Sequence, residues 1–271
     1  MKHVPWAGIG RGVMVVLLLS GLAVRAAVAA QDDAARQYAV AADLQGRGEF
    51  SQAASAWREF IAQHKRDERM ARAYENLGVC LYQEGKYAQA VEALEKAVAA
   101  KDPKDAAAPR ALSMAAQASL KAGAFPAALQ YVAKFQAAHP GHALLPDVLH
   151  VAAESDLQLG KLAEADAIYS QLIEKYPSNP TAELWKVRRG AILHAQKKYE
   201  ETIRYLDPLV AELRSPDCVA EARYLVGESQ LELKQPGEAA KSLAASWEVQ
   251  PTWRQAFETG LALAEAYRQT G

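Results

Sequence analysis

The sequence predicts an all-α protein built as a solenoid of helix-turn-helix hairpins with a period of about 37 residues. Three observations lead to this prediction. Alanine makes up 57 of the 271 residues, and alanine loses the least free energy on entering a helix. A short glycine motif returns at nearly constant spacing. Prolines are few, 12 in all, and several of them close a repeat unit.

Composition and charge exclude several classes of protein. About half of the residues (51%) are apolar, which suffices for a sizeable core. The 31 basic and 32 acidic side chains are nearly balanced, whereas a nucleic-acid-binding protein normally carries a basic excess or stripe. Two cysteines are too few for a disulfide-scaffolded fold.

Residues 1–30 have the pattern of a signal peptide. Lys2, Arg11 and Arg25 are present without any acid, the run 12–24 is apolar, and small residues follow at 26–30. We expect cleavage after Ala29 or Ala30, and export to the periplasm or cell envelope of a bacterium. The alternative is an uncleaved membrane anchor, for which 13 residues are short. After cleavage we expect no membrane span.

Export would place Cys80 and Cys218 in an oxidising compartment. They are 138 residues apart in the sequence. An extended repeat fold would keep their Cα atoms well beyond the ~6 Å that a disulfide requires. We therefore expect two unpaired helix residues.

The chain after the signal peptide repeats a Gly-x-aromatic-x-x-Ala motif. The clear copies start with glycine, the weaker ones start with lysine, and the last residue falls one further period on. These starting positions, spaced by 37 or 38 residues, are Gly48, Gly85, Gly123, Gly160, Lys197, Lys234 and Gly271. Such self-similarity is typical of repeat architectures.

Two further columns of the repeat confirm this register. Seven residues before each starting position stands a glycine or alanine, namely Ala41, Gly78, Ala116, Ala153, Gly190, Gly227 and Ala264. Four residues after the motif alanine position stands a large apolar residue, namely Trp57, Leu94, Val132, Tyr169, Leu206 and Leu243. We expect the small residues to let paired helices approach closely, and the large ones to fill the gap to the next unit.

Each unit is expected to form two helices. Between Ala71 and Ala100, apolar or small residues recur at steps of three and four on both sides of Gly85. Gly85 stands where a helix end needs a left-handed turn. One hairpin cannot bury its apolar face, but stacked hairpins can. The solenoid over 31–271 then has six units and a partial seventh, at about 34–70, 71–108, 109–145, 146–182, 183–219, 220–256 and 257–271.

These features resemble the tetratricopeptide repeat family over nearly all of residues 34–271. The family pattern W-x2-L-G-x2-Y…A-x3-F…P is met in the second unit by Tyr74, Leu77, Gly78, Leu81, Ala90, Leu94 and Ala97. Ser119 and Asp156 stand where the pattern has a large ring, and the period is 37 rather than 34. The resemblance implies a right-handed superhelix.

The longer units with a Tyr-Pro link, as at 168–177, are similar to the bacterial envelope subgroup of this family. That subgroup includes the outer-membrane assembly lipoprotein of the barrel-insertion machine and the Tol-Pal-associated coordinator. No cysteine lies near the predicted cleavage site, so the chain lacks the lipobox of the lipoprotein.

No motif indicates catalysis, a cofactor or a metal. His139, His142 and His150 do not have an established zinc spacing, and Pro140-Gly141 is better interpreted as a link between units. Nucleophile-elbow, phosphate-loop, zinc-protease and dinucleotide motifs are absent from the sequence. We therefore expect a protein that is not an enzyme.

The resemblance implies a partner-binding groove, because such arrays bind extended peptides or helices on a concave face lined by the first helix of each unit. The early positions of this groove are Tyr38, Arg72, Tyr82, Arg110, Gln117 and Lys121. The later positions are Asp147, His150, Glu154, His194, Glu221, Tyr224, Glu228 and Glu232. The groove would run from basic to acidic. The alternative interpretation is that these residues form ordinary solvated helix faces.

The expected function is an exported, non-catalytic scaffold that binds protein or peptide segments in the cell envelope. The alternative is an N-terminal targeting or regulatory array of a longer protein, whose catalytic domain would lie outside this sequence.

Overall fold

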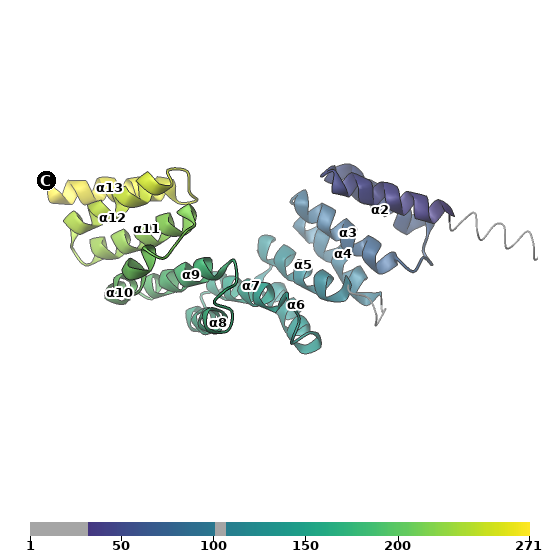
Figure 1. Ribbon diagram of the computed structural model, residues 1–271, viewed down its shortest axis with the longest axis horizontal. Helices are drawn as coiled ribbons and strands as arrows, with labels where there is room; N and C mark the ends of the chain where they lie inside the picture. Colours follow the sequence, from purple (N-terminus) through teal and green to yellow (C-terminus); the bar gives the residue numbers. More distant parts are fainter. Residues whose placement is uncertain (1–31, 101–106) are drawn as a thin grey trace, which may run out of the picture. The chain divides into compact units, whose positions relative to one another are not determined.

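The computed structural model describes residues 32–100 and 107–271, and every regular element in these ranges is an α-helix (Figure 1). This confirms the expected all-α repeat fold. The predicted signal peptide lies outside the described residues. Within them, no helix is both long and apolar enough to cross a membrane.

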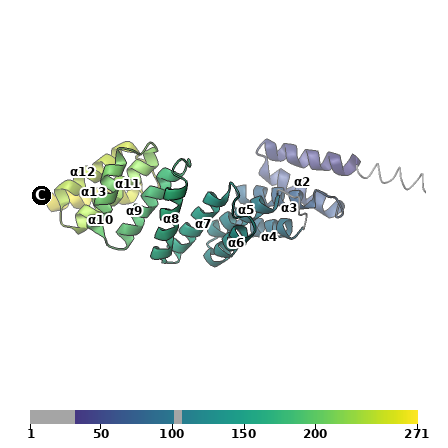
Figure 2. The ribbon, with the colours of Figure 1, turned by 60° about the horizontal axis from the view of Figure 1, so that its bottom comes forward.

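The chain forms two compact units, and the boundary between them follows Ala118, inside α5 (Ala107–Lys121). The N-terminal unit contains, before α5, a helix over 32–46, α2 (Phe50–Gln63), α3 (Met70–Gln83) and α4 (Tyr87–Ala99). Helix α3 packs against both α2 and α4 (Figure 2).

The C-terminal unit continues the alternation of first and second helices. Each helix from α6 onward packs against the next, and α11 also contacts α9 and α13. The first helices α9, α11 and α13 therefore lie in a row. The helices are α6 (Phe125–Ala138), α7 (Leu145–Gln158), α8 (Leu162–Lys175), α9 (Ala182–Ala195), α10 (Tyr199–Val210), α11 (Pro216–Glu232), α12 (Pro236–Val249) and α13 (Ala256–Thr270).

Local sequence explains where the helices start and stop. The four glycines that start the clear motif copies have left-handed φ between +72° and +77°, as the turn prediction requires. Lys197 and Lys234 adopt the same conformation, with φ of 60° and 61°. Helix α11 begins at a proline after Ser215, whose Oγ accepts a hydrogen bond from the backbone N–H of Cys218 at 3.4 Å.

The small-residue column lies where the two helices of a hairpin cross. A Cβ atom built on Gly78 would stand 2.5 Å from Cγ of Leu94, and Gly190 and Gly227 are covered in the same way by Leu206 and Leu243. Leu206 and Leu243 also share core clusters with the first helix of the next unit, in agreement with the expectation that the large residues fill that gap. Each leucine thus also packs inside its own hairpin, because a residue without a side chain leaves room for it there.

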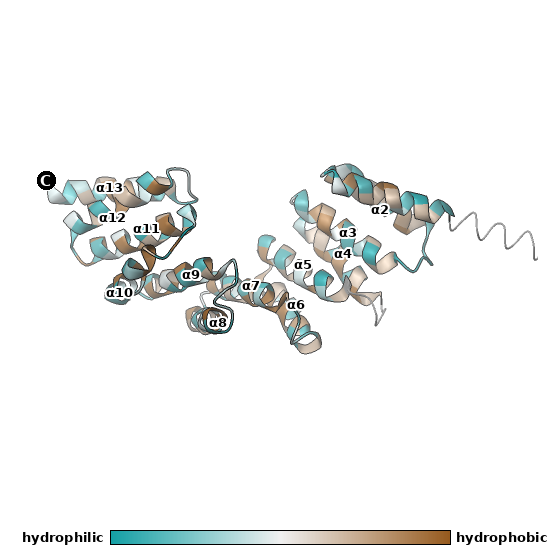
Figure 3. Ribbon diagram, in the orientation of Figure 1, coloured by the Kyte–Doolittle hydropathy of each residue, from teal (hydrophilic) through white to brown (hydrophobic). Residues whose placement is uncertain are grey.

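The core is divided into local clusters rather than gathered in one centre. Trp57 and Phe60 lie in a cluster of the N-terminal unit, and Tyr169 and Trp185 lie in one of the C-terminal unit. Because each helix buries only one face in such a cluster, apolar and polar residues alternate along most helices (Figure 3). Cys80 and Cys218 are both free and buried, in agreement with the expected absence of a pairing between them.

Candidate functional site

Five of the expected groove residues lie in the N-terminal unit, and Tyr38 is the one most tightly packed. Its ring makes edge-to-face contacts with Trp57 (4.7 Å between centroids) and Phe60 (5.3 Å). The guanidinium of Arg69 lies 4.8 Å from the ring centre. Burial raises the pKa of the Tyr38 hydroxyl. Tyr38 is therefore part of the local core as well as of the surface.

The basic start of the expected groove is partly neutralised. Arg110 is exposed, but its Nε lies 2.9 Å from a carboxylate oxygen of Glu75, which is almost completely buried. Arg72 is exposed on the same helix as Glu75. Glu75, the acid that balances the charge of Arg110, is not among the residues predicted from the sequence.

Tyr82 and Gln117 are half-buried at helix surfaces of the N-terminal unit. The ring of Tyr82 stands edge-on to Tyr87 at 5.3 Å, across the turn between α3 and α4, and burial raises its pKa. Gln117 donates a hydrogen bond to Oγ of Ser113, one helical turn earlier, at 3.3 Å.

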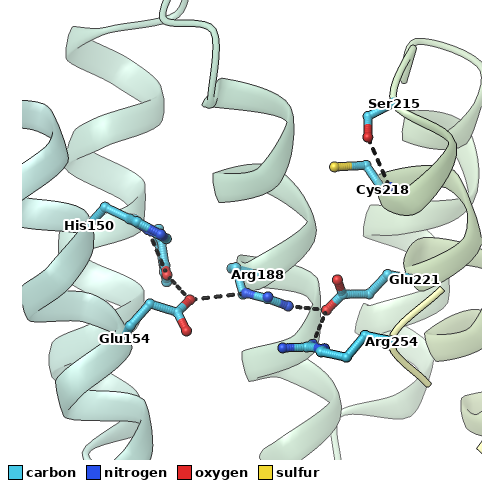
Figure 4. Close-up of polar contacts among 8 residues, drawn as sticks. His150, Glu154, Arg188, Ser215, Cys218, Glu221 and Arg254 are labelled. Atoms are coloured by element: carbon cyan, nitrogen blue, oxygen red, sulfur yellow. Dashed lines mark hydrogen bonds and ion pairs between the residues drawn. The ribbon is translucent and has the colours of Figure 1, made fainter. Parts of the chain in front are cut away.

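The other nine residues lie in the C-terminal unit, where a buried ion-pair network holds two of them, Glu154 and Glu221. The Nε of Arg188 on α9 donates to Oε1 of Glu154 on α7 at 3.0 Å, and its Nη1 donates to Glu221 on α11 (Figure 4). Arg254, just before α13, contacts the same Glu221 oxygen at 3.5 Å. Three successive repeats are thus joined through one chain of charges.

Further hydrogen bonds orient the Glu154 end of this network. The hydroxyl of Tyr169 on α8 donates to Glu154 at 2.5 Å and lies 3.2 Å from Nδ1 of His150. Burial lowers the pKa of His150, which keeps the imidazole neutral. Burial alone would lower the pKa of Arg188, but the carboxylates of Glu221 and Glu154 outweigh it and raise that pKa.

The network corrects the expected charge of the groove, because Glu154 and Glu221 are compensated by Arg188 and Arg254. Arg188 is not among the residues predicted from the sequence, although its position in the repeat indicates an ion pair. One period away on either side stand Val151 and Leu225, which are both buried. A charged residue in an apolar column of the repeat indicates a buried ion pair.

A second group of C-terminal residues keeps uncompensated negative charge. Glu228 and Glu232 are one turn apart on α11, and burial followed by the charge of Glu232 raises the pKa of Glu228. Burial and then the charges of Glu228 and Glu258 raise the pKa of Tyr224 to about 12. The structure gives no ion pair to these three carboxylates among the described residues.

The remaining positions border this acidic region or stand alone. The Tyr224 ring lies edge-on to Trp253 at 5.5 Å, and His194 lies 5.5 Å from the ring of Tyr199. Burial lowers the pKa of His194, and its Nε2 is buried without a hydrogen-bond partner among the described residues. Lys121 is exposed at the end of α5.

The arrangement offers binding chemistry. Over residues 32–100 and 107–271, no three His, Cys, Asp or Glu side chains gather as metal ligands. His139 and His142 pack instead around Phe135, at 5.5 and 5.8 Å, in the link between α6 and α7. The first helices present half-buried tyrosines, ion-paired carboxylates and carboxylates without an ion pair. Such side chains can contact both the apolar and the charged groups of a peptide.

Comparison with protein families and solved structures agrees with this description. A family model for the tetratricopeptide repeat matches residues 38–106 and 85–143, and a second one matches 147–179. Together these matches cover 139 of the 271 residues. A search of curated protein sequences finds no match.

Several solved structures share the fold at low identity. The pilF protein of Pseudomonas aeruginosa is 17% identical with a TM-score of 0.60, over 86% of this chain and 99% of that one. A thermophilic TPR protein of Thermus thermophilus is 22% identical with a TM-score of 0.51, over 73% and 99%. YrrB, described as a TPR protein with an unusual peptide-binding site, is 18% identical with a TM-score of 0.53, over 76% and 98%.

TPR proteins are protein-interaction scaffolds that bind protein or peptide partners. The repeat motif with its left-handed turns, the small residues at the helix crossings and the family matches lead to the same conclusion. This chain belongs to the tetratricopeptide repeat family.

Proposed function

We propose that this protein is an exported, non-catalytic scaffold of the bacterial cell envelope that binds protein or peptide segments on the surface of its first helices. The observation that carries the proposal is the row of first helices in the C-terminal unit. Arg188 ties α7, α9 and α11 together, and Tyr224 and Glu228 on α11 are only half-buried.

Binding would use two kinds of contact. Half-buried rings such as Tyr82 and Tyr224 would supply buried contact area, because aromatic anchors carry much of the affinity of an interface. Charged groups such as Arg72 and Glu232 would orient the segment and speed its association. The fixed ion pairs around Arg188 would keep the helices in place and so lower the entropy cost of binding.

Export is supported by the leader pattern of residues 1–30. The test is expression in a bacterial host, fractionation, and N-terminal sequencing of the periplasmic protein. We expect a mature chain that begins at Ala30 or Gln31. An intact Met1 in the membrane fraction would contradict export with cleavage.

The binding surface is tested by site-specific photocrosslinking in envelope extracts. A photoreactive residue is placed at exposed first-helix positions, Arg72, Lys121 and Glu232, and at exposed second-helix positions, Lys134, Glu201 and Lys241. We expect the first-helix positions to capture the same partner and the second-helix positions to capture none. Capture confined to the second helices would overturn the proposed surface.

A further inference from the structure

A cavity of about 510 Å³ lies at the links between repeats of the C-terminal unit. It is lined by residues 140–143 of the link between α6 and α7, by residues 175–179 at the link between α8 and α9, and by the first two residues of α7. Small-molecule sites usually have volumes of about 300–1,000 Å³, with mostly apolar walls and a few polar groups that orient the ligand. The volume is therefore sufficient for a small molecule or for the end of a peptide.

The two links that line the cavity have the same backbone conformation, one repeat apart. The N–H of His142 donates to the carbonyl oxygen of His139 at 3.1 Å, and the N–H of Asn179 donates to that of Tyr176 at 3.0 Å. In each link a proline follows the residue whose carbonyl accepts this bond. The cavity is therefore a product of the repeat itself, because two turns of the same shape line it.

The side chains that close these turns keep hydrogen-bond donors to spare. Nδ1 of His142 accepts the backbone N–H of Leu144 at 3.1 Å, so the proton of a neutral imidazole lies on Nε2, which then can only donate. Oδ1 of Asn179 accepts the N–H and the hydroxyl of Thr181, at 2.9 and 2.7 Å, which leaves the two hydrogens of its amide nitrogen. The structure shows no acceptor for these donors among the described residues.

Lys175, the last residue of α8, supplies the charge of the cavity. It forms no ion pair within the part of the chain that the structure describes. The described residues of the lining include no acidic side chain. A ligand with a single negative charge would therefore match the lining, because an ammonium group and N–H donors bind an anion through charge-assisted hydrogen bonds.

Most of the remaining wall is apolar. Three proline rings, the Leu145 side chain and the half-buried ring of Tyr176 form it, and the prolines are Pro140, Pro146 and Pro177. An inorganic anion would leave these surfaces in contact with water, whereas a ligand with an apolar body would cover them.

We propose that this cavity binds a carboxylate carried by a small apolar body. A carboxylate has the one charge that Lys175 balances, and its two oxygens accept the hydrogen bonds that His142 and Asn179 offer. Both a free carboxylic acid and the C-terminal residue of a peptide have this chemistry. None of the residues proposed for the first-helix surface lines the cavity, so this inference does not depend on that surface.

The first test follows binding to the purified protein by proton–nitrogen NMR, because the side-chain amide of Asn179 gives a signal at the site. The probes are hexanoate, the peptide acetyl-Ala-Ala-Leu with a free carboxyl end, the same peptide with an amidated end, and inorganic phosphate. We expect at least one of the two carboxylates to shift this signal with a dissociation constant of about 0.1–10 mM, as suits a ligand of few atoms. The amidated peptide and phosphate should bind at least tenfold more weakly.

The four probes also separate the possible sources of the carboxylate. Binding of hexanoate alone would support the proposal with a free acid as the ligand, and binding of the peptide acid would support it with a peptide end. No shift with either carboxylate at about 50 mM, above the weakest binding expected, overturns the proposal. Equal binding of the amidated peptide or of phosphate overturns it as well.

Asn179→Asp tests the donors without removing the turn. It replaces the amide nitrogen with a second negatively charged oxygen and keeps the oxygen that accepts the N–H of Thr181. An aspartate already has this role in the link before α3, where Oδ1 of Asp67 accepts the N–H of Arg69 at 2.8 Å. The variant should therefore fold, and it should bind the carboxylate probes at least tenfold more weakly, as followed on the backbone amide of Ser178.

Lys175→Ala tests the charge. It should weaken carboxylate binding by about tenfold, because a charge-assisted contact is lost. Lys134→Ala, at an exposed lysine of α6 outside the cavity, is the matched control and should bind like the wild type. Carboxylate binding that is unchanged in both Lys175→Ala and Asn179→Asp would locate the ligand elsewhere and overturn the proposal.

Discussion

Some charged residues of the C-terminal unit have an oppositely charged partner, and others do not. Arg188 is mostly buried and holds Glu154 and Glu221, while Glu228 and Glu232 on α11 have no cation beside them among the described residues. The first set joins repeats together. The second leaves negative charge at the surface, where a bound segment could compensate it.

Removing Arg188 should therefore be costly. Arg188→Met would leave the largely buried Glu154 without a cation and Glu221 with only the exposed Arg254, and breaking a buried ion pair in this way costs about 3–5 kcal/mol. Arg189→Met is the matched control, because the adjacent Arg189 pairs with Asp166 in a more exposed contact that is worth about 0–1 kcal/mol. Urea denaturation of both variants measures the difference in free energy of unfolding.

A second variant distinguishes the effect of the lost ion pairs from the effect of the lost packing of the Arg188 side chain. Adding Glu154→Gln and Glu221→Gln to Arg188→Met removes the uncompensated charges and should restore part of the lost stability. Equal losses for Arg188→Met and Arg189→Met would show that the network is no stronger than a surface pair.

Glu228 should make stability depend on pH. Its pKa is raised in the folded protein, so between pH 4.5 and that higher value the folded state binds more protons than the unfolded state. Stability therefore falls as pH rises through this window, and the penalty is complete above it. Glu228→Gln should stabilise the protein at pH 7, because burial and then the charge of Glu232 disfavour the carboxylate, and the repulsive pair one turn apart alone contributes about 0.5 kcal/mol.

The measurement is thermal denaturation at pH 7 and at pH 4, where the difference between Glu228→Gln and the wild type should vanish. Glu248→Gln, at an exposed carboxylate of α12, serves as the control. A gain that is the same at both pH values would mean that the amide stabilises the helix for another reason.

At the scale of elements, the hairpin is held by a small residue beneath a large one. Gly227→Leu would drive a side chain into Leu243, whose Cγ lies 2.6 Å from the position of a Cβ, and overpacking of this kind costs about 1–3 kcal/mol or more. Gly237→Ala on α12 is the control, because nothing lies within 4 Å of its Cβ. It should raise the melting temperature slightly, since alanine favours helix over glycine.

The sequence was sufficient to predict the repeat and its turns, because these depend on local chemistry. Gly85 has the left-handed conformation that the turn requires, and the three glycines of the column that contains Gly78 all lie where two helices cross. The large residues of the second helices were expected against the next unit, and periodicity did not reveal that leucines such as Leu206 also lie on the glycine of their own hairpin.

The candidate site was less predictable, because its contacts join residues about one repeat apart. Glu154 and Glu221 were expected to be free acids, yet they lie 34 and 33 positions from the arginine that balances them. Only side-chain geometry in the folded chain decides such pairings. Arg188 could have been suspected from its apolar column, but its two carboxylate partners could not.

At the scale of the whole molecule, the apolar core is a series of local clusters. A substitution that destabilises one unit should therefore leave the stability of the other unit unchanged. In repeat proteins, stability is close to a sum of the terms for each repeat and its neighbours. Gly78→Leu would force a side chain onto Leu94, within the N-terminal unit, and should lower the free energy of local opening by about 1–3 kcal/mol.

Hydrogen exchange of the backbone amides, followed by mass spectrometry, measures this opening for each helix. In Gly78→Leu we expect exchange to be faster by about five- to 150-fold in α3 and α4, the factor that 1–3 kcal/mol implies, and unchanged in α11 and α12. Gly227→Leu should give the reciprocal pattern, because Leu243 lies in a separate cluster of the C-terminal unit. If either variant accelerates exchange equally in all these helices, the chain unfolds as one cooperative body despite its divided core.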